Sequence, residues 1–433
     1  MFFSLNLRYN LNVMKVSHLI MFLLSVITIG CKNDDNGSNS SNTAPGVFNL
    51  IGVTDNAIQV DPFPNFNWEA STDPDGDSVT YDFYLDKNPD PSTLVAADLG
   101  SPSYSAFEQL NFLSQYFWKV IAKDGNGGVT SSTIFSFTTR KLRLPNIPVP
   151  TSMVFDARFS QSAAAFQNKL WIIGGVVDGV GYDDDVWSTS NGIDWSPVTN
   201  SAPFTPRGDQ ATVAFNNRLW VIGGVFNTSE NDVWSSGDGL DWVEVTSAAP
   251  FSERHGHSAL VFNNKIWVIG GYDISTNTFY NDVWSSADGV TWAQSTANAA
   301  FSARSHHEAV VFKDKILVIG GFTINDATSN DIWSSIDGIT WVEETSSAAF
   351  DPRNRHTVTA YNDQLVLIGG FNSINSLSDI WTSVDGVNWE EIDNPGPFPA
   401  LNSHTATVIS NKLWVIAGAS VNGAATNGVW ILD

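Results

Sequence analysis

Hydrophobic and polar residues alternate along this chain in short runs, which Gly, Asn and Asp residues separate. Between residues 45 and 140, such runs are FNWEAS (66–71), SVTYDFYLD (78–86), YFWKVIAKD (116–124) and VTSSTIFSFTT (129–139). Period-two alternation bounded by turn sequences such as DPDGD and GNGG predicts β-strands that bury one face. We therefore expect a small antiparallel sandwich over residues 45–140.

From residue 155 onward, the pattern repeats with a period near 50 residues. The first Trp of NDVWSSADGVTW (281–292) returns at intervals of 47 to 50 residues, six times in all, as Trp187, Trp234, Trp284, Trp333, Trp381 and Trp430. Each repeat carries four short segments, which in the third are HSALVF (257–262), KIWVIGG (265–271), NDVWSS (281–286) and TWAQS (291–295). Four short strands at this period are typical of a propeller blade.

A diglycine ends the second predicted strand of the first five repeats, and Ala417-Gly418 replaces it in the sixth. Glycine permits close backbone approaches that a Cβ forbids, as expected where blades crowd together. With these motifs, the repeats resemble the kelch family over about two-thirds of the chain. The resemblance implies an all-β fold with a six-bladed kelch-like β-propeller, used in that family as a binding platform and in a few members as an enzyme. The diglycines are Gly174-Gly175, Gly223-Gly224, Gly270-Gly271, Gly320-Gly321 and Gly369-Gly370.

The unit at 45–140 resembles the fibronectin type III family through Trp68, the strand at 116–120 and the ending Phe135-Ser136-Phe137. Its acidic turn contains Asp73, Asp75 and Asp77, and oxygen-rich loops can hold calcium. No Glu follows at the spacing of a calcium loop, and Pro-Asp-Gly is itself a strong turn sequence. We interpret the turn as a plain hairpin and the unit as a spacer.

The sixth repeat stops after its third strand, at residues 428–433. Before the first repeat, PVPTSMVFDAR (148–158) matches the end of a blade such as VEVTSAAPFSER (243–254). We therefore expect residues 142–149 to pair with the last blade and close the propeller, which makes 141–433 one domain.

The links from the fourth strand of one repeat to the first strand of the next should lie at the diglycine end, here called the top face. One Arg holds the same register in five links, with Leu401 in the sixth, and a His or Gln follows three residues later. Such a ring could form a positive funnel for a carboxylate or an anionic sugar. Alternatively, each Arg could tie neighbouring blades through carbonyl groups. The candidate ligand-binding residues are Arg158, Arg207, Arg254, His257, Arg304, His307, Arg353, His356 and His404, with Gln161 and Gln210 at the His position of the first two repeats and His255 and His306 beside it.

Two functions from different classes remain open. The first is a binding module for a glycan or protein ligand, and the second is a carbohydrate-active enzyme, such as a sialic-acid-type epimerase, a mutarotase or a lyase, that uses a His beside an Arg. The copper oxidases of the kelch family are excluded because their Cys–Tyr thioether needs a cysteine, and the folded part has none. No catalytic triad or metal-ligand spacing stands out, so we expect no catalytic metal and no cofactor. Aromatic residues of the top loops could stack on a sugar or pack between blades, namely Tyr182, Phe226, Tyr272, Phe279, Tyr280, Phe322 and Phe371.

The Asp-Gly step in the recurring stretch is a turn rather than a catalytic group. The first repeat reads Asn191-Gly192 at this place, which keeps the turn chemistry and loses the carboxylate. We expect a three-residue hairpin loop with left-handed Gly, which puts Trp284 and Trp292 on one face. The spacing is also one residue short of the sialidase Asp-box.

The N-terminal segment predicts export and lipid anchoring. An apolar run from Leu19 to Ile29 follows Lys15 and is too short to span as a stable helix. Residues 1–30 resemble a bacterial lipoprotein signal, with Cys31 as the lipid-bearing residue, and the following KNDD resembles the export tag of Bacteroidetes-type surface lipoproteins. Residues 31–44 form a polar tether. We expect a monomer at the outer membrane, exposed at the surface.

The formal charge of −24 argues against a nucleic-acid partner, which needs clustered Lys and Arg. The expected partners are therefore the membrane, through the lipid anchor, and a glycan or protein ligand.

Lipid anchoring at Cys31 can be tested in cells. A clickable fatty acid fed to bacteria that express the full chain should label the protein, and Cys31→Ala should abolish the label because no other thiol exists. Label that persists in Cys31→Ala would contradict the assignment.

Overall fold

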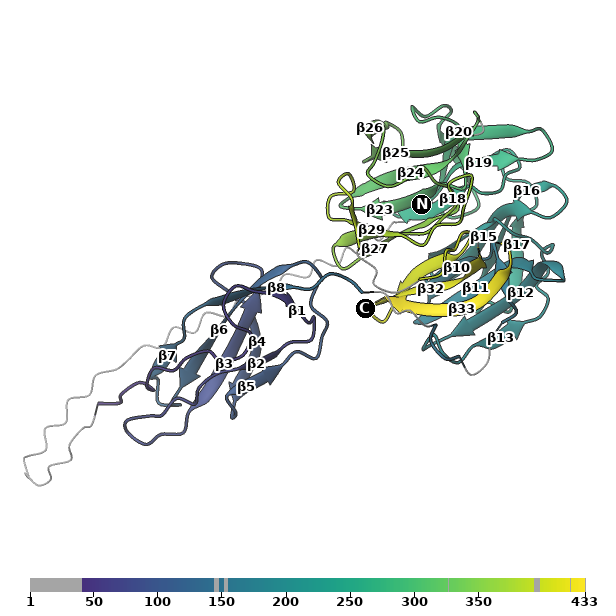
Figure 1. Cartoon of the computed structure of the whole chain (residues 1–433). Helices are drawn as coiled ribbons and strands as arrows, with labels where there is room; N and C mark the ends of the chain where they lie inside the picture. The colour runs from purple at the N-terminus through teal and green to yellow at the C-terminus, as the bar shows by residue number, and fades with distance from the viewer. Residues whose placement is uncertain are drawn as a thin grey trace, which may run out of the picture.

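A computed structural model describes residues 41–143, 148–151, 155–325, 327–392, 398–420 and 422–432. Cys31 and the signal segment lie outside these residues. All regular elements within them are β-strands, so the all-β expectation is confirmed. The described part of the chain holds no helix that could cross a membrane. Figure 1 shows two lobes, with the N-terminal unit beside the larger repeat region.

The N-terminal unit consists of a six-stranded sheet and a two-stranded sheet. The first has the order β1-β8-β6-β3-β4, with β7 paired to β6, and the second joins β2 to β5. Phe66 of β2 lies 4.8 Å from Phe83 and 5.0 Å from Trp118 of the larger sheet, measured between ring centroids, so aromatic residues fill the space between the sheets. The strands are β1 (Ala57–Val60), β2 (Asn65–Asn67), β3 (Thr80–Asp86), β4 (Leu94–Leu99), β5 (Ser103–Ser105), β6 (Gln115–Lys123), β7 (Val129–Ser131) and β8 (Phe135–Thr139).

In the acidic turn of this unit, one carboxylate oxygen of Asp73 accepts hydrogen bonds from the backbone amides of Asp75 and Asp77. That is the contact of a hairpin turn.

The second to fifth repeats each form an antiparallel sheet of their own, in which the four main strands pair in chain order, and the four strands of the first repeat pair in the same order. The innermost strands β10, β14, β18, β23, β27 and β31 contact one another in sequence, and β31 contacts β10. The region is therefore a β-propeller. Its strands are β10 (Ser162–Phe166), β11 (Lys169–Val177), β12 (Gly181–Thr189) and β13 (Ser196–Thr199); β14 (Ala211–Phe215), β15 (Arg218–Val225), β16 (Ser229–Ser236) and β17 (Trp242–Thr246); β18 (Ser258–Phe262), β19 (Lys265–Asp273), β20 (Thr278–Ser286) and β21 (Ala293–Thr296); β23 (Glu308–Phe312), β24 (Lys315–Thr323), β25 (Ala327–Ser335) and β26 (Val342–Thr345); β27 (Thr357–Tyr361), β28 (Gln364–Ile368), β29 (Ile380–Ser383) and β30 (Glu390–Glu391); and β31 (Thr405–Ile409), β32 (Lys412–Ala419) and β33 (Ala425–Leu432).

The first and sixth repeats share one sheet. The short strand β9 (Arg158–Phe159) pairs with both β11 and β33, and a similar strand, β22 (Arg304–Ser305), pairs with β24. Before β9, the amide of Val149 donates to the carbonyl of Val429 in β33 at 2.7 Å. Residues 144–147 of the expected closing segment lie outside the described residues, so closure by 142–149 stays a prediction.

The Asp-Gly hairpins connect neighbouring repeats at the face opposite the top. Gly289 has φ of 75°, and a Cβ added there would lie 2.2 Å from the ring of Trp220 in the preceding repeat. One Asp288 oxygen accepts from the amides of Val290 and Thr291, and Asn191 makes the same contacts with its amide oxygen in the first repeat. The hairpin needs an oxygen here and not a charge, so the turn interpretation is confirmed.

The two Trp side chains of a hairpin share a face as expected, but the expectation of a three-residue loop is wrong: in the second repeat the last paired residues are Ser236 and Trp242, so five residues form the loop. Trp284 and Trp292 both pack edge-on against Phe251.

The N-terminal unit contacts the bottom of the propeller. Asn111 and Lys87 both bind Asp363, at the turn between β27 and β28, and Phe112 packs against Tyr361. The top face thus lies at the end of the propeller away from the N-terminal unit.

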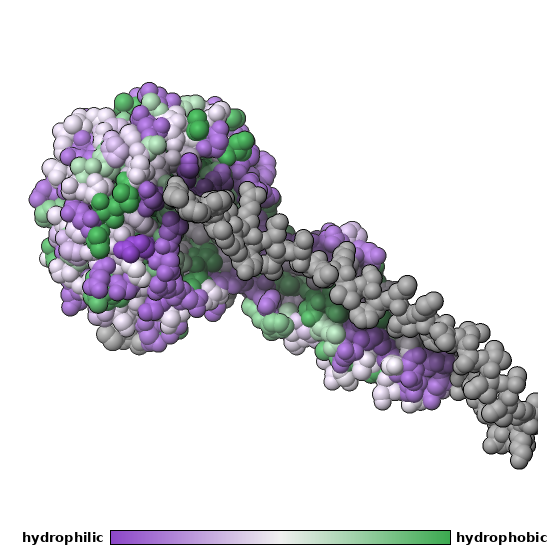
Figure 2. Space-filling model, turned by 180° about the vertical axis from the view of Figure 1, so that it is seen from behind, coloured by the Kyte–Doolittle hydropathy of each residue, from purple (hydrophilic) through white to green (hydrophobic). Residues whose placement is uncertain are grey.

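On the face seen in Figure 2, hydrophobic residues are scattered among hydrophilic ones over the propeller.

Candidate functional site

The five candidate arginines are buried inside the blades. Their side chains are 0 or 1 % exposed. In the third repeat, Arg254 donates to both oxygens of Asp282, at 2.7 and 3.0 Å, and to the carbonyl of Gly270 at 2.8 Å. The other four make the same contacts, with Asp185, Asp232, Asp331 and Asp379 as partners. The guanidinium groups therefore form no funnel. They have a scaffold role, but they do not tie neighbouring blades through carbonyl groups as expected, because the Asp and the carbonyl that each one binds belong to its own repeat.

The sixth repeat replaces both members of this ion pair. Leu401 stands where the others have Arg, and Gly428 stands where they have Asp. Leu401 is buried in one apolar cluster with Phe398 and Trp430. The two charges are absent together because a buried carboxylate without its cation would be strongly destabilising.

The candidate His and Gln residues stand between neighbouring blades. Gln210 donates to the carbonyl of Ile173 in the preceding repeat at 2.8 Å. His356 occupies the same register in the fifth repeat. Its ring lies so close to Gly320 of the preceding repeat that a Cβ at Gly320 would be only 3.0 Å from it. Burial, reinforced by Arg353, lowers the pKa of His356 to about 3, and burial lowers that of His404 to about 4. His257, with a pKa lowered by burial to about 3, and His307 also remain neutral near pH 7, so these four rings act as uncharged wedges.

Two residues after each Arg, the backbone forms a closed ring around the propeller axis. The residue there donates its amide hydrogen to the carbonyl of the equivalent residue in the preceding repeat, at 2.6 to 3.0 Å, and the sixth residue completes the circle with the first. All six adopt left-handed φ values between 49° and 57°. We call these residues the axial ring: Ser160, Asp209, Gly256, His306, Arg355 and Ser403.

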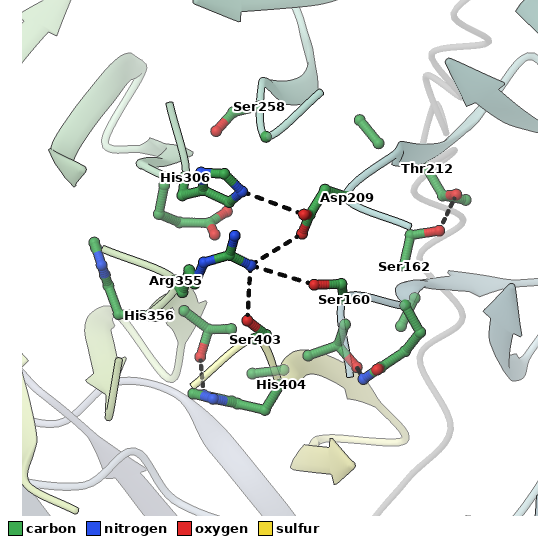
Figure 3. Close-up of a pocket in the computed structure, with 18 of the residues that line it drawn as sticks. Ser160, Ser162, Asp209, Thr212, Ser258, His306, Arg355, His356, Ser403 and His404 are labelled. Atoms are coloured by element: carbon green, nitrogen blue, oxygen red, sulfur yellow. Dashed lines mark hydrogen bonds and ion pairs between the residues drawn. The ribbon is translucent and has the colours of Figure 1, made fainter. Parts of the chain in front are cut away.

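The side chains of the axial ring differ from repeat to repeat and converge on Arg355 (Figure 3). Its Nη1 donates to the hydroxyl oxygens of Ser160, at 3.3 Å, and Ser403, at 3.1 Å. The same atom lies 3.4 Å from Oδ1 of Asp209, whose Oδ2 lies 3.3 Å from Nε2 of His306. The Arg355 side chain is 30 % exposed, so this guanidinium, unlike the five scaffold ones, is open to a ligand.

The charges of this cluster are fixed by mutual contact. Burial alone would raise the pKa of Asp209, but Arg355 and His306 hold it far below its usual value, so it is ionised. Burial lowers the pKa of His255, in the same cluster, to about 4. Burial and Arg355 together lower the pKa of His306, with Asp209 opposing them. Near pH 7 the cluster therefore holds one carboxylate, one guanidinium and two neutral imidazoles.

The axial ring surrounds the mouth of a cavity of about 220 Å³. Its walls carry the side chains of Ser162, Thr212, Ser258, Glu308 and Thr357, besides the four candidate histidines. Pockets for drug-sized ligands span roughly 300–1,000 Å³, so this one suits a small molecule or a single sugar unit. Burial raises the pKa of Glu308 to about 8, so a protonated carboxyl faces the cavity near neutral pH.

The aromatic residues of the top loops pair across neighbouring repeats. Tyr182 meets Phe226 edge-on at 5.7 Å, and Phe279 lies 5.9 Å from Phe322. Tyr280 stacks on the buried Arg254 at 4.5 Å. Packing therefore accounts for these aromatic side chains, although that of Phe226 is also exposed to solvent.

Sequence reasoning singled out His255 and His306 only as neighbours of the candidate register and missed Asp209 and Arg355. A signal was present: the repeats read Ser, Asp, Gly, His, Arg and Ser at this position, although an Arg stands two residues before it in five repeats and a Gln or His follows it in all six. Polar variety at one register of an otherwise regular repeat marks the place where the scaffold is free to differ.

The buried ion pair can be tested by copying the sixth repeat into the third. Arg254→Leu should destabilise the chain by about 3–5 kcal/mol, because it leaves Asp282 buried without a cation. Adding Asp282→Gly should restore at least half of that loss, as measured by urea denaturation. A double variant no more stable than Arg254→Leu would contradict this account.

The buried histidines should make the chain sensitive to acid. Because the pKa of His356 is lower in the folded than in the unfolded chain, its contribution to stability is complete above about pH 6.5 and is lost as the pH falls toward 3. His356→Gln should therefore reduce the loss of unfolding free energy between pH 6.5 and 5 by about 2 kcal/mol. Thermal melts at several pH values check this, and equal pH dependence in both proteins would refute it. At pH 7.5 the variant should melt near the wild type, because Gln already occupies this register in two repeats.

Comparison with known proteins places the repeat region. The chain is similar to the solved structure titled "Structure of YjhT", with 17 % sequence identity and a TM-score of 0.54, over 66 % of this chain and 96 % of that one. This likeness shows the fold. No curated protein sequence matches significantly. The family model of the KLHDC2/KLHL20/DRC7 Kelch-repeats domain matches residues 120–321 and 286–433, which together span well over half of the chain. The chain therefore belongs to this kelch-repeat family.

Proposed function

We propose that this chain is a surface lipoprotein whose propeller binds a small carboxylate-bearing ligand, such as an acidic sugar unit of a glycan, in the axial cavity. The observation that carries the proposal is the state of Arg355. Three oxygens position its Nη1, whereas Nε and Nη2 have no hydrogen-bond partner among the described residues. A guanidinium held at one nitrogen and free at two is arranged to bind a carboxylate through two hydrogen bonds.

The size and polarity of the cavity support a small ligand over a folded protein partner. About 220 Å³ corresponds to roughly seven water molecules, at about 30 Å³ each. Serine and threonine hydroxyls line its wall and can exchange hydrogen bonds with sugar hydroxyls. A protein ligand could insert at most a single carboxylate side chain.

The proposed architecture has six blades, closed by residues 142–149, and a fibronectin type III-like spacer. The six-membered backbone ring and the contact of Val149 with Val429 support it, and a crystal structure would test it. The spacer contacts the face opposite the axial cavity. A lipid anchor at Cys31 would then leave the cavity mouth directed away from the membrane.

A second candidate is a carbohydrate isomerase of the epimerase or mutarotase type. Glu308 favours it, because a carboxyl with its pKa raised to about 8 can donate a proton near neutral pH. The neutral imidazole of His306 is an acceptor in the same cavity lining. In NMR spectra of the ligand, an epimerase would produce the signals of a new epimer and a mutarotase would speed the equilibration of a freshly dissolved single anomer, whereas a binding module would do neither.

Ligand binding can be measured by NMR titration of the full chain with glucuronic acid and glucose, or sialic acid and its methyl ester. Each pair differs in its carboxylate, so only the acid should bind. Arg355→Ala should weaken binding by about 10- to 100-fold, and Arg355→Lys, which keeps the charge without the planar fork, should fall between.

The matched control is Arg218→Ala, because Arg218 bonds Ser235 at the bottom of the second repeat. It should bind like the wild type. Equal binding of acid and neutral partner, or undiminished binding by a folded Arg355→Ala, would refute the proposal.

A further inference from the structure

Three side chains from different repeats bring potential metal-ligand atoms together beside the cavity mouth. One ligand atom from each of Asp209, His255 and His306 lies within 4.8 Å of the other two. The 3.3 Å between Oδ2 of Asp209 and Nε2 of His306 matches the spacing expected of two ligands on one tetrahedral ion, given bonds of about 2.0–2.1 Å. His255 would need to approach by no more than about 1.5 Å, within the reach of a side-chain adjustment.

The atoms around this cluster hold the ligands as second-shell groups do in metal proteins. Nδ1 of His255 lies 2.9 Å from the Ser229 hydroxyl, and Nδ1 of His306 lies 3.1 Å from that of Ser305. A ring held at Nδ1 presents Nε2 to a metal, and such partners fix the tautomer that ligation needs.

The two carboxylate oxygens of Asp209 have different partners, as the two ring nitrogens of each His do. Oδ2 faces His306, while Oδ1 faces Arg355 at 3.4 Å. Arg355 thus supports the oxygen that would not bind the ion.

We propose that Asp209, His255 and His306 form a binding site for a divalent transition-metal ion, with zinc as the best match to two imidazoles and one carboxylate. Three protein ligands leave a fourth position, as in sites that take water or a substrate. The ion would add a positive charge close to Arg355, which lies 3.4 Å from the other carboxylate oxygen of Asp209. This inference concerns metal affinity and does not depend on the proposed sugar ligand.

The chain's sequence carries no metal-ligand spacing because the ligands come from different repeats. Asp209 and His306 belong to the axial ring, whereas His255 lies one residue before the ring position that Gly256 occupies. Gly256 has no side chain, so it leaves room beside the His306 ring, which a Cβ at that position would approach to 2.8 Å.

The test is titration of the full-length chain, stripped with EDTA, with zinc chloride in a calorimeter. One saturable site is expected, and His306→Ala and Asp209→Asn should each weaken it by at least ten-fold. Ser229→Ala removes the contact to Nδ1 of His255, together with the contacts of the hydroxyl to the Tyr272 carbonyl and the Ile274 amide, and should weaken zinc binding by about ten-fold. His356→Gln is the matched control, because it removes a histidine of the same cavity that is outside the cluster, and its affinity should equal that of the wild type.

Cobalt gives a readout that does not depend on whether the variants fold. Cobalt chloride added to the wild type should produce the intense visible absorption of a tetrahedral site, without the charge-transfer bands of a thiolate ligand. Absence of saturable zinc binding, a weak octahedral cobalt spectrum, or equal zinc affinity in folded His306→Ala and Asp209→Asn would each overturn the proposal.

Discussion

In five of the six repeats, a buried ion pair between an Arg before the first strand and an Asp on the third strand supports the backbone on which the axial site is built. In the third repeat, the backbone of Arg254 also bonds the preceding repeat: its amide donates to Glu230, and its carbonyl accepts from Gly224. One residue therefore joins two strands of its own blade, β19 and β20, to two strands of the preceding blade, β15 and β16. Because the axial ring residue follows only two positions later, the position of the ion pair fixes the place where the ring side chain enters the cavity. The scaffold arginines act on the site through this placement, without touching a ligand.

The sixth repeat shows what the charges contribute. Leu401 and Gly428 replace the pair with apolar packing, while the backbone contacts are kept: Leu401 donates to Leu377 and accepts from Gly370. Buried ion pairs are often no more stable than well-packed apolar substitutes, so the pair's role is better described as fixing one geometry than as adding stability. The five repeats with the ion pair and the one repeat with apolar packing form the same backbone ring. The ring geometry is therefore a property of the backbone arrangement, which either chemistry can support.

On this uniform backbone, the side chains are free to differ, and the difference makes the site. Six left-handed residues present Ser, Asp, no side chain, His, Arg and Ser to one small space. A ring of identical residues would place like charges together, but this order puts a carboxylate, a guanidinium and neutral imidazoles within contact of one another. Burial, which keeps the histidines neutral, also raises the pKa of Glu308. A regular scaffold with different axial residues in each repeat thus brings a carboxylate, a guanidinium and imidazoles together at one site.

The repeat period, the diglycines and the Asp-Gly turns were sufficient to predict an all-β kelch propeller, because backbone constraints such as left-handed glycine act locally and recur with the repeat. The presence of Asn191 in the first repeat, where the other hairpins have Asp, likewise predicted from the sequence that the turn is structural. The arginines were harder: their register could be read, but whether a guanidinium faces solvent or an Asp 28 residues away depends on how strands pair. Asp209 precedes His306 by 97 residues and His306 precedes Arg355 by 49, and only closure of the ring brings them together. Sequence determined the blade, since its contacts are near in the chain; tertiary structure decided the site, since its contacts exist only between blades.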